Sequence, residues 1–302
     1  MKPRVRKNHP EQGIYLFSPG GAVMPEDFTR GIAILDEFGL KYRQDPYCLT
    51  HAPDWEYLAG TDKQRAEAIR EAFIGNYNAV MAVRGGYGTL RAALLALSGL
   101  VVPVPLPVVM GFSDVTVLHA LLNSRGLISF HGPNLTGLAS TDRHTIQKTA
   151  SVLSGRAGRP DLSLSTLRAL TGNGIIQARL LGGNLSVWCS MLGTGLLPDA
   201  RDAILLLEDT GEPAYRIDRM LLQLRLAMAS NPPAAVVFGQ VSDENNDIEF
   251  ILRSFARDIG VPVAVGAPVG HGRLNHPLAL NAMYSLDINQ GQLSLLEDVY
   301  ED

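Results

Sequence analysis

Short apolar runs alternate along this chain with longer segments of helical periodicity, and this alternation limits the folds open to it. The apolar runs of the first half are residues 14–17, 79–83 and 107–110, each closed by a glycine-rich or polar turn. Helical patterns cover residues 25–37, 61–76, 89–98 and 115–124. A strand–turn–helix unit repeated in this way predicts a mostly parallel sheet flanked by helices.

The second half of the chain shows the same rhythm after an irregular stretch. Strands are predicted at residues 175–180, 203–207, 234–238 and 262–265, and helices at 185–192, 214–229 and 247–258. A length of 302 residues favours two domains. We predict an α/β protein: an N-terminal domain over residues 1–140, a linker region over 141–174 with one helix near 144–153, and a second, smaller α/β domain over 175–302.

Composition excludes several classes of partner. Apolar residues make up 46% and charged residues 19%, and the net charge of −4 gives no basic surplus for binding nucleic acid or an anionic membrane surface. No run reaches the about 18 apolar residues of a membrane span, and no signal-peptide pattern follows the basic N-terminus. Cys48 and Cys189 lack metal or redox spacing, so we expect reduced thiols and a cytoplasmic protein.

Ser113 is the first candidate for chemistry, in the Gly-Phe-Ser-Asp sequence at residues 111–114. It follows a predicted strand and precedes a predicted helix, which is where parallel sheets place their active groups. Free N–H groups at the helix start would favour an oxyanion beside Ser113. Taken alone, the position is more typical of a helix-capping residue, and Val115 replaces the second glycine of a G-x-S-x-G elbow.

Glu208 and His271 occupy comparable places in the second half. Glu208 directly follows the predicted strand at residues 203–207, which would hold its carboxylate at the edge of the sheet, although an acid in a solvated loop gives the same pattern. His271 lies between glycines after the last predicted strand, where local packing gives little reason for a histidine. Among the other histidines, His119 is expected to be packed inside a helix, whereas His131 could line the site.

Ser113, Glu208 and His271 together follow one known chain order of a catalytic triad. A serine hydroxyl is a weak nucleophile until a base removes its proton. An imidazole does this near neutral pH, and a carboxylate fixes its tautomer and stabilises the imidazolium. The pattern therefore predicts acyl-transfer chemistry, provided that the three side chains converge.

Other chemistries have weaker support in the sequence. The glycine-rich turn at residues 84–88 matches neither a dinucleotide fingerprint nor a phosphate-binding loop, so no nucleotide cofactor is expected. Its backbone N–H groups could instead complete an oxyanion hole. No H-E-x-x-H motif and no cluster of acids and histidines at ligand spacing is present, so no metal is expected either.

Seven short motifs follow one another along nearly the whole chain. They are Arg-Gly-Gly-Tyr-Gly at 84–88, Gly-Phe-Ser-Asp at 111–114, Phe-His-Gly-Pro at 130–133, Gly-Gly-Asn-Leu at 182–185, Leu-Glu-Asp at 207–209, Pro-Ala-Tyr-Arg-Ile-Asp-Arg-Met at 213–220 and Gly-His at 270–271. In this order they resemble the LD-carboxypeptidases, serine peptidases of the muramoyltetrapeptide carboxypeptidase type. The resemblance places the nucleophile on Ser113, the acid on Glu208 and the base on His271.

The resemblance also implies a mechanism. Ser113 would attack the carbonyl of the third residue of a murein tetrapeptide, His271 would take the proton and Glu208 would orient His271. D-Alanine would then leave, and water would resolve the acyl-enzyme. Our hypothesis for the oxyanion hole is the pair of backbone N–H groups of Gly86 and Asp114.

Three further residues are expected to bind substrate: Arg84, Asn184 and His131. Arg84 could pair with a substrate carboxylate, although a surface or interdomain salt bridge fits the sequence equally well. The resemblance implies a murein peptide as substrate, a role in peptidoglycan recycling, a homodimer and no cofactor.

Other functions fit parts of the pattern. A second branch of the same family cleaves peptide–nucleotide antibiotics and gives self-immunity, and the motifs do not separate the two branches. A non-catalytic two-domain protein that binds a sugar or nucleotide would use the same strand-end loops without acyl transfer. A metallohydrolase is the third alternative.

Overall fold

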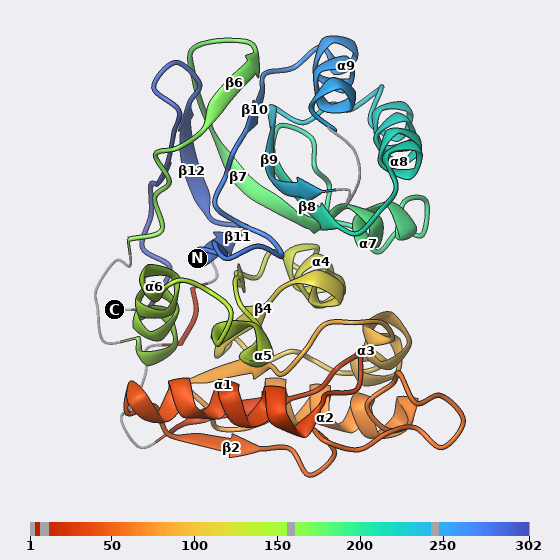
Figure 1. The fold of residues 1–302 in the computed structure, drawn as a ribbon, viewed down its shortest axis with the longest axis vertical. Helices are drawn as coiled ribbons and strands as arrows, with labels where there is room; N and C mark the ends of the chain where they lie inside the picture. Colours follow the sequence, from red (N-terminus) through yellow and green to blue (C-terminus); the bar gives the residue numbers. More distant parts are fainter. Residues whose placement is uncertain (1–3, 7–11, 156–160, 243–247, 302) are drawn as a thin grey trace.

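The protein contains two β-sheets with helices packed around each, as Figure 1 shows for the computed structural model. The structure describes residues 4–6, 12–155, 161–242 and 248–301. Residue 247, the predicted start of one helix, lies outside the described residues. The N-terminal half builds the lower unit in Figure 1 and most of the remaining chain builds the upper one, which confirms the predicted two-part α/β fold.

The first sheet has six strands in the order β11-β5-β4-β3-β1-β2. Their bounds are Ile14–Phe17 for β1, Tyr42–Gln44 for β2, Ala79–Ala82 for β3, Val108–Gly111 for β4, Ser129–His131 for β5 and Leu278–Leu280 for β11. Strands β1 to β5 run parallel, and β11 pairs antiparallel with β5 at the edge. The predicted mostly parallel sheet is confirmed, and the chain returns to it through β11.

Apart from α5, which the sequence did not predict, the helices around the first sheet begin where the sequence predicts or within a residue of it. They are α1 (Pro25–Glu37), α2 (Asp62–Ile74), α3 (Thr89–Leu97), α4 (Thr116–Asn123), α5 (Leu135–Leu138) and α6 (Arg143–Ser154). In α2, Thr61 and Gln64 form a reciprocal capping box. Every residue of α4 is buried, because this helix packs against strand β7 of the second sheet.

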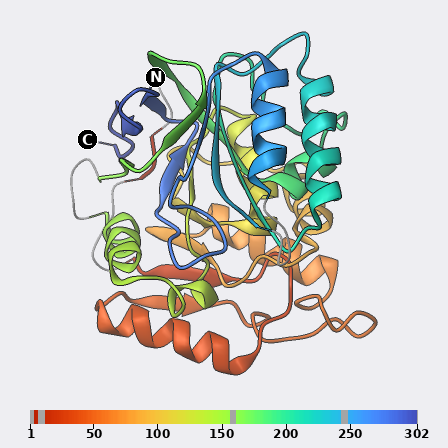
Figure 2. The same cartoon turned by 45° about the horizontal axis from the view of Figure 1, so that its top comes forward.

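The second sheet has seven strands in the order β13-β12-β7-β8-β9-β10-β6. Their bounds are Arg168–Thr171 for β6, Ile175–Asn184 for β7, Ile204–Thr210 for β8, Ala235–Ser242 for β9, Val263–Val265 for β10, Met283–Asp287 for β12 and Gln292–Leu295 for β13. Strands β7 to β10 run parallel. Helices α7 (Leu185–Ser190), α8 (Ala214–Ala227) and α9 (Glu249–Ile259) accompany this sheet, and α8 and α9 lie side by side (Figures 1 and 2).

Alternation along the strands divides the core into layers. In β1, Ile14 and Leu16 face one hydrophobic cluster, whereas Tyr15 and Phe17 face another, because successive side chains of a strand point to opposite faces. The first cluster continues into the second sheet through Ile204 and Leu206. The two units therefore share one continuous core, which fixes the carboxyl ends of their strands relative to each other.

The two cysteines match their prediction. Cys48 and Cys189 are buried and unpaired, as their spacing predicts. Within the described ranges, no helix is long and apolar enough to cross a membrane.

Candidate active site

Ser113 stands at the turn between β4 and α4, at the carboxyl edge of the first sheet. A short 3-10 turn over Ser113–Val115 makes the connection. The backbone φ of Ser113 is +63°, and the left-handed region costs a residue with a Cβ roughly 1–2 kcal/mol. A strained strand-to-helix turn of this kind exposes a serine hydroxyl above the edge of a sheet.

Two buried side chains hold the backbone directly before Ser113. The amide of Asn134 accepts a hydrogen bond from the Phe112 N–H over 3.1 Å and donates one to the Phe112 carbonyl over 3.4 Å. The Nε2 atom of His119 lies 2.9 Å from the Gly111 carbonyl oxygen and carries the proton, because a carbonyl can only accept. These hydrogen bonds stabilise the strained backbone conformation of the Ser113 turn.

The turn after β3 packs against Ser113. A Cβ built on Gly85 would lie 2.8 Å from the Ser113 Cβ and 2.9 Å from its Oγ, so a side chain at this position would collide with the serine. The N–H groups of Gly86 and Asp114 donate no hydrogen bond to any described residue. Two free N–H donors beside the serine are what an oxyanion hole requires.

The Asp114 carboxylate has a structural use. Its Oδ2 accepts a hydrogen bond over 2.8 Å from the N–H of Thr89, the first residue of α3. Burial raises the pKa of Asp114, and the Thr89 hydrogen bond and the Arg65 charge act in the opposite direction. The carboxylate thereby ties the Ser113 turn to the neighbouring helix.

Glu208 and His271 form a hydrogen-bonded pair in the second unit. Glu208 is fully buried and lies inside β8. The sequence had predicted it directly after the end of this strand. Its Oε2 lies 2.8 Å from the Nδ1 of His271. Gly270 permits this approach: its φ is +126°, and a Cβ there would lie 3.0 Å from the carboxylate oxygen. The pairing leaves Nε2 of His271 available to act as a base.

The pair makes the imidazole a stronger base than a free histidine. Burial alone would lower the pKa of His271, but the hydrogen bond and the charge of Glu208 outweigh burial, and the net pKa is raised. Burial raises the pKa of Glu208, and the bond to His271 opposes that shift. The carboxylate therefore stabilises the imidazolium that forms when Nε2 of His271 takes a proton.

A hydrogen-bonded path joins the two halves of the site through Asn184. This residue is the register partner of Glu208 on the adjacent strand β7. Its backbone N–H donates a hydrogen bond over 2.9 Å to Oγ1 of Thr116. Thr116 lies three residues after Ser113 in the chain. Its side-chain amide donates to Oε1 of Glu208 over 3.4 Å. The Ser113 turn and the carboxylate are thus linked across the junction between the sheets.

The histidine lies beside the serine turn. The ring centroid of Phe112 is 4.7 Å from that of His271, and Ser113 is the next residue along the chain. No direct hydrogen bond joins the Ser113 hydroxyl to the imidazole among the described residues. Such catalytic bonds often tighten when substrate binds.

The three predicted substrate-binding residues lie in different surroundings. Arg84 is exposed, donates to the Ala22 carbonyl over 2.7 Å and forms no ion pair with the described residues, so its charge is open to an anionic ligand. His131 is fully buried, and burial lowers its pKa to about 3. Asn184 is buried, with its amide bonded to Glu208 and Asp209. Contact of the latter two with substrate would require their side chains to move.

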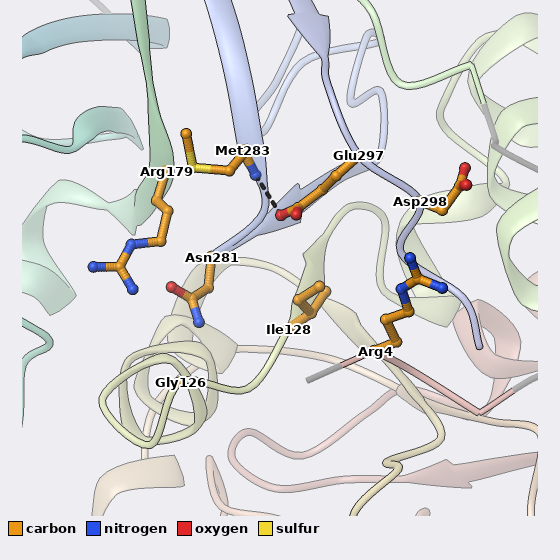
Figure 3. A pocket seen from close by; sticks show the side chains of 8 residues that line it. All are labelled: Arg4, Gly126, Ile128, Arg179, Asn281, Met283, Glu297 and Asp298. Carbon is orange, nitrogen blue, oxygen red and sulfur yellow. Dashed lines mark hydrogen bonds between the residues drawn. The ribbon is translucent and has the colours of Figure 1, made fainter. Parts of the chain in front are cut away.

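Elsewhere, the described residues form a separate cavity but no metal site. Among the residues that the structure describes, no group of three or more His, Cys, Asp or Glu side chains could hold a metal ion. A cavity of about 200 Å³ includes Ile128, Arg179 and Asn281 in its lining (Figure 3). Ile128 leads into the amino end of β5, so this cavity lies at the opposite edge of the first sheet from Ser113.

Sequence reasoning did not single out Asn134 and Thr116 as functional residues, and it treated His119 as packing alone. Asn134 directly follows the Phe-His-Gly-Pro motif at residues 130–133, and this position next to a family motif could have identified it as a functional candidate. The contacts of Asn134 and Thr116 reach across 22 and 68 residues of chain, which no local pattern records.

A serine on a strained turn, beside a buried carboxylate–imidazole pair at the junction of two α/β units, defines a serine hydrolase. The sequence patterns of the LD-carboxypeptidase N-terminal and C-terminal domains match residues 14–132 and 177–286. The chain belongs to the LD-carboxypeptidase family of serine carboxypeptidases.

Named relatives agree with this assignment. The murein tetrapeptide carboxypeptidase of Pseudomonas aeruginosa is 31% identical over 276 residues, covering 87% of this chain and 89% of that protein. The solved muramoyltetrapeptide carboxypeptidase of Oxalobacter formigenes has a TM-score of 0.77 at 26% identity, over 94% of this chain and 99% of that one. The microcin C7 self-immunity protein of Escherichia coli is 22% identical, over 93% and 91% of the two chains.

Proposed function

We propose that this enzyme hydrolyses the L,D bond that releases the terminal D-alanine from murein tetrapeptides, with Ser113, His271 and Glu208 as its catalytic triad. The observation that carries the proposal is the 2.8 Å hydrogen bond between His271 and the buried Glu208, beside the strained Ser113 turn. The choice of substrate is supported by the similarity to a murein tetrapeptide carboxypeptidase.

In the acylation step, the Ser113 oxygen bonds to the carbonyl carbon of the third peptide residue while Nε2 of His271 takes the hydroxyl proton. The tetrahedral intermediate collapses, the C–N bond breaks, and the imidazolium returns the proton to the leaving amine of D-alanine. In deacylation, His271 takes a proton from water as the water oxygen bonds to the ester carbonyl carbon. The bond between this carbon and the Ser113 oxygen then breaks, and the imidazolium returns its proton to the serine oxygen. Glu208 holds the imidazole and stabilises its charged form in both steps.

The oxyanion is proposed to bind the free N–H groups of Gly86 and Asp114. Loss of one such donor typically costs about 3 kcal/mol of transition-state stabilisation. Arg84 is proposed to bind a carboxylate of the substrate, because Arg84 is exposed and has no carboxylate partner among the described residues.

A peptide–nucleotide conjugate is the competing substrate. The named self-immunity relative shares 22% identity with this chain, whereas the named murein enzyme shares 31%. The murein peptide therefore has the stronger support.

The proposed setting is murein recycling in the cytoplasm by a homodimer. Two buried, unpaired cysteines suit a reducing compartment. Tyr215, Leu222 and Leu226 of α8 are exposed at helical spacing, and such an apolar stripe suits a contact with a second copy. Light scattering of the purified protein tests the dimer, and fractionation of cells tests the compartment.

Incubation with a murein tetrapeptide, a D-alanine-free tripeptide and a peptide–nucleotide conjugate, with products read by mass, tests the proposal. We expect the tetrapeptide to yield tripeptide and D-alanine, and the Ser113→Ala variant to yield neither while keeping its circular dichroism spectrum. Cleavage of the conjugate alone, or undiminished activity in Ser113→Ala, would overturn the proposed substrate or the proposed nucleophile respectively.

A further inference from the structure

Three exposed aromatic side chains lie next to one another near the Ser113 turn. Trp55, Tyr57 and Tyr87 are 43%, 56% and 55% exposed. The ring centroids of Trp55 and Tyr57 are 6.5 Å apart, and those of Tyr57 and Tyr87 are 6.1 Å apart. We name these three residues the aromatic row. Adjacent aromatic rings left in water are characteristic of binding surfaces.

The aromatic row is continuous with the active site. Tyr87 lies two residues after Gly85, whose backbone packs against Ser113. The loop after β1 connects this turn to the rest of the row: its Ala22 N–H donates to the Tyr57 carbonyl over 2.8 Å. Because β4, β3 and β1 are neighbours in the sheet, the row extends from the serine along the carboxyl edge of the first sheet.

The far end of the row is held in place. The Arg91 guanidinium lies 4.7 Å from the centroid of the Trp55 ring. The same guanidinium donates to the Asp62 carboxylate at the start of α2, over 2.9 Å from Nε and 2.6 Å from Nη2. A ring ordered before binding loses little freedom when a ligand packs on it.

We propose that the aromatic row is a subsite for the sugar of the substrate, an N-acetylated aminosugar at the end of the peptide away from the scissile bond. This inference rests on the proposed function, because a murein peptide is the substrate that carries such a sugar. Pyranose rings present flat C–H faces that pack on aromatic faces, and tyrosine hydroxyls can bond to sugar hydroxyls.

Steady-state kinetics separate the sugar from the peptide. For Trp55→Ala and Tyr57→Ala, we expect KM for muramoyl-tetrapeptide to rise about tenfold, which corresponds to about 1.4 kcal/mol, with kcat unchanged. KM for the free tetrapeptide should change less than about twofold. Phe250→Ala on α9, which removes a ring that is 73% exposed and distant in sequence from the row, is the matched control and should leave both substrates unaffected.

Equal effects on both peptide substrates, or no effect on either, would overturn the subsite. A KM effect confined to the peptide–nucleotide conjugate would also overturn it and would assign the aromatic row to a nucleobase. A changed oligomeric state of the variants in light scattering would overturn it as well and would assign the aromatic row to a subunit contact. Failure of the wild type to cleave either murein substrate would instead contradict the proposed function.

Fluorescence gives a readout that does not need catalysis. The chain has two tryptophans, and Trp188 is fully buried, so ligand-dependent changes report on Trp55. In the Ser113→Ala variant, N-acetylmuramic acid should shift the emission to shorter wavelength and saturate. Trp55→Phe in the same background should abolish this shift, and a shift that survives the substitution would contradict the assignment.

Discussion

At the scale of single residues, function depends on conformations and charges that the bare fold does not need. Ser113 adopts a left-handed backbone conformation that disfavours any residue with a Cβ. Glu208 carries a carboxylate into a fully buried position, where His271 is its hydrogen-bond partner. Each feature costs stability, and both occur where the proposed reaction needs an accessible hydroxyl and a strong base.

The raised pKa of His271 fixes the direction of the pH dependence. A general base must be neutral, so kcat/KM should fall as pH decreases through the raised pKa of His271, above the about 6.5 of a free histidine. In Glu208→Gln, burial would dominate and lower that pKa, so the acid limb should move to lower pH while kcat drops by up to about 10⁴-fold. A pH–rate profile checks this, and an unmoved limb would refute the pairing.

Gly85 gives a steric prediction. In Gly85→Ala the new methyl group would meet the Ser113 side chain at 2.8–2.9 Å, so the serine must shift and kcat should fall about 100-fold. Gly137→Ala is the control, because a Cβ there meets its nearest neighbour at 3.8 Å. Comparable activity in the two variants, measured on murein tetrapeptide, would show that Gly85 does not position the nucleophile.

At the scale of elements, the site is positioned by the ends of strands and by the hydrogen bonds that hold the turns after them. The sequence predicted β1, β3, β4 and β8 from apolar runs, and the rule that parallel strands place active groups at their carboxyl ends then led to Ser113 and Glu208. Strand β2 was not predicted because all three of its residues are exposed and carry no apolar pattern. Strand β7 was predicted to end at residue 180, but it continues through Gly182 and Gly183, because both pair with β8.

Asn134 is expected to position the Ser113 turn through both of its hydrogen bonds to Phe112. Asn134→Ala should lower kcat about tenfold with little change in KM, and should cost about 1–3 kcal/mol of unfolding free energy, because it leaves backbone groups of Phe112 unpaired. Asn134→Asp keeps the acceptor for the N–H and should recover part of kcat. Kinetics with chemical denaturation test this, and a loss of stability without loss of kcat would contradict a positioning role.

At the scale of the whole molecule, the site exists because two units share one core. Phe112 and Ser113 come from the first unit, whereas Glu208 and His271 come from the second, and their meeting depends on how the sheets pack. Residue patterns predict each strand end separately. The pairing of Thr116 with Asn184 across the junction is a tertiary contact, and for that reason the sequence could not reveal it.

Thr116→Val tests the coupling of the two units. Valine has nearly the same shape as threonine but cannot accept a hydrogen bond from the Asn184 N–H. The free energy of unfolding should therefore decrease by about 1–3 kcal/mol, and kcat should fall. Thr145→Val is the matched control, because the Thr145 hydroxyl oxygen is buried without a partner among the described residues. We expect the control to be neutral or stabilising, and equal losses in both variants would contradict the coupling.

The convergence of Ser113 and His271 across the junction can be measured directly by labelling with a serine-directed fluorophosphonate, followed by peptide mapping. We predict one adduct, on the peptide that contains Ser113, and its near-complete loss in a folded His271→Ala variant, because the hydroxyl reacts only when the imidazole removes its proton. Labelling at another residue, or undiminished labelling of Ser113 without the histidine, would contradict the triad.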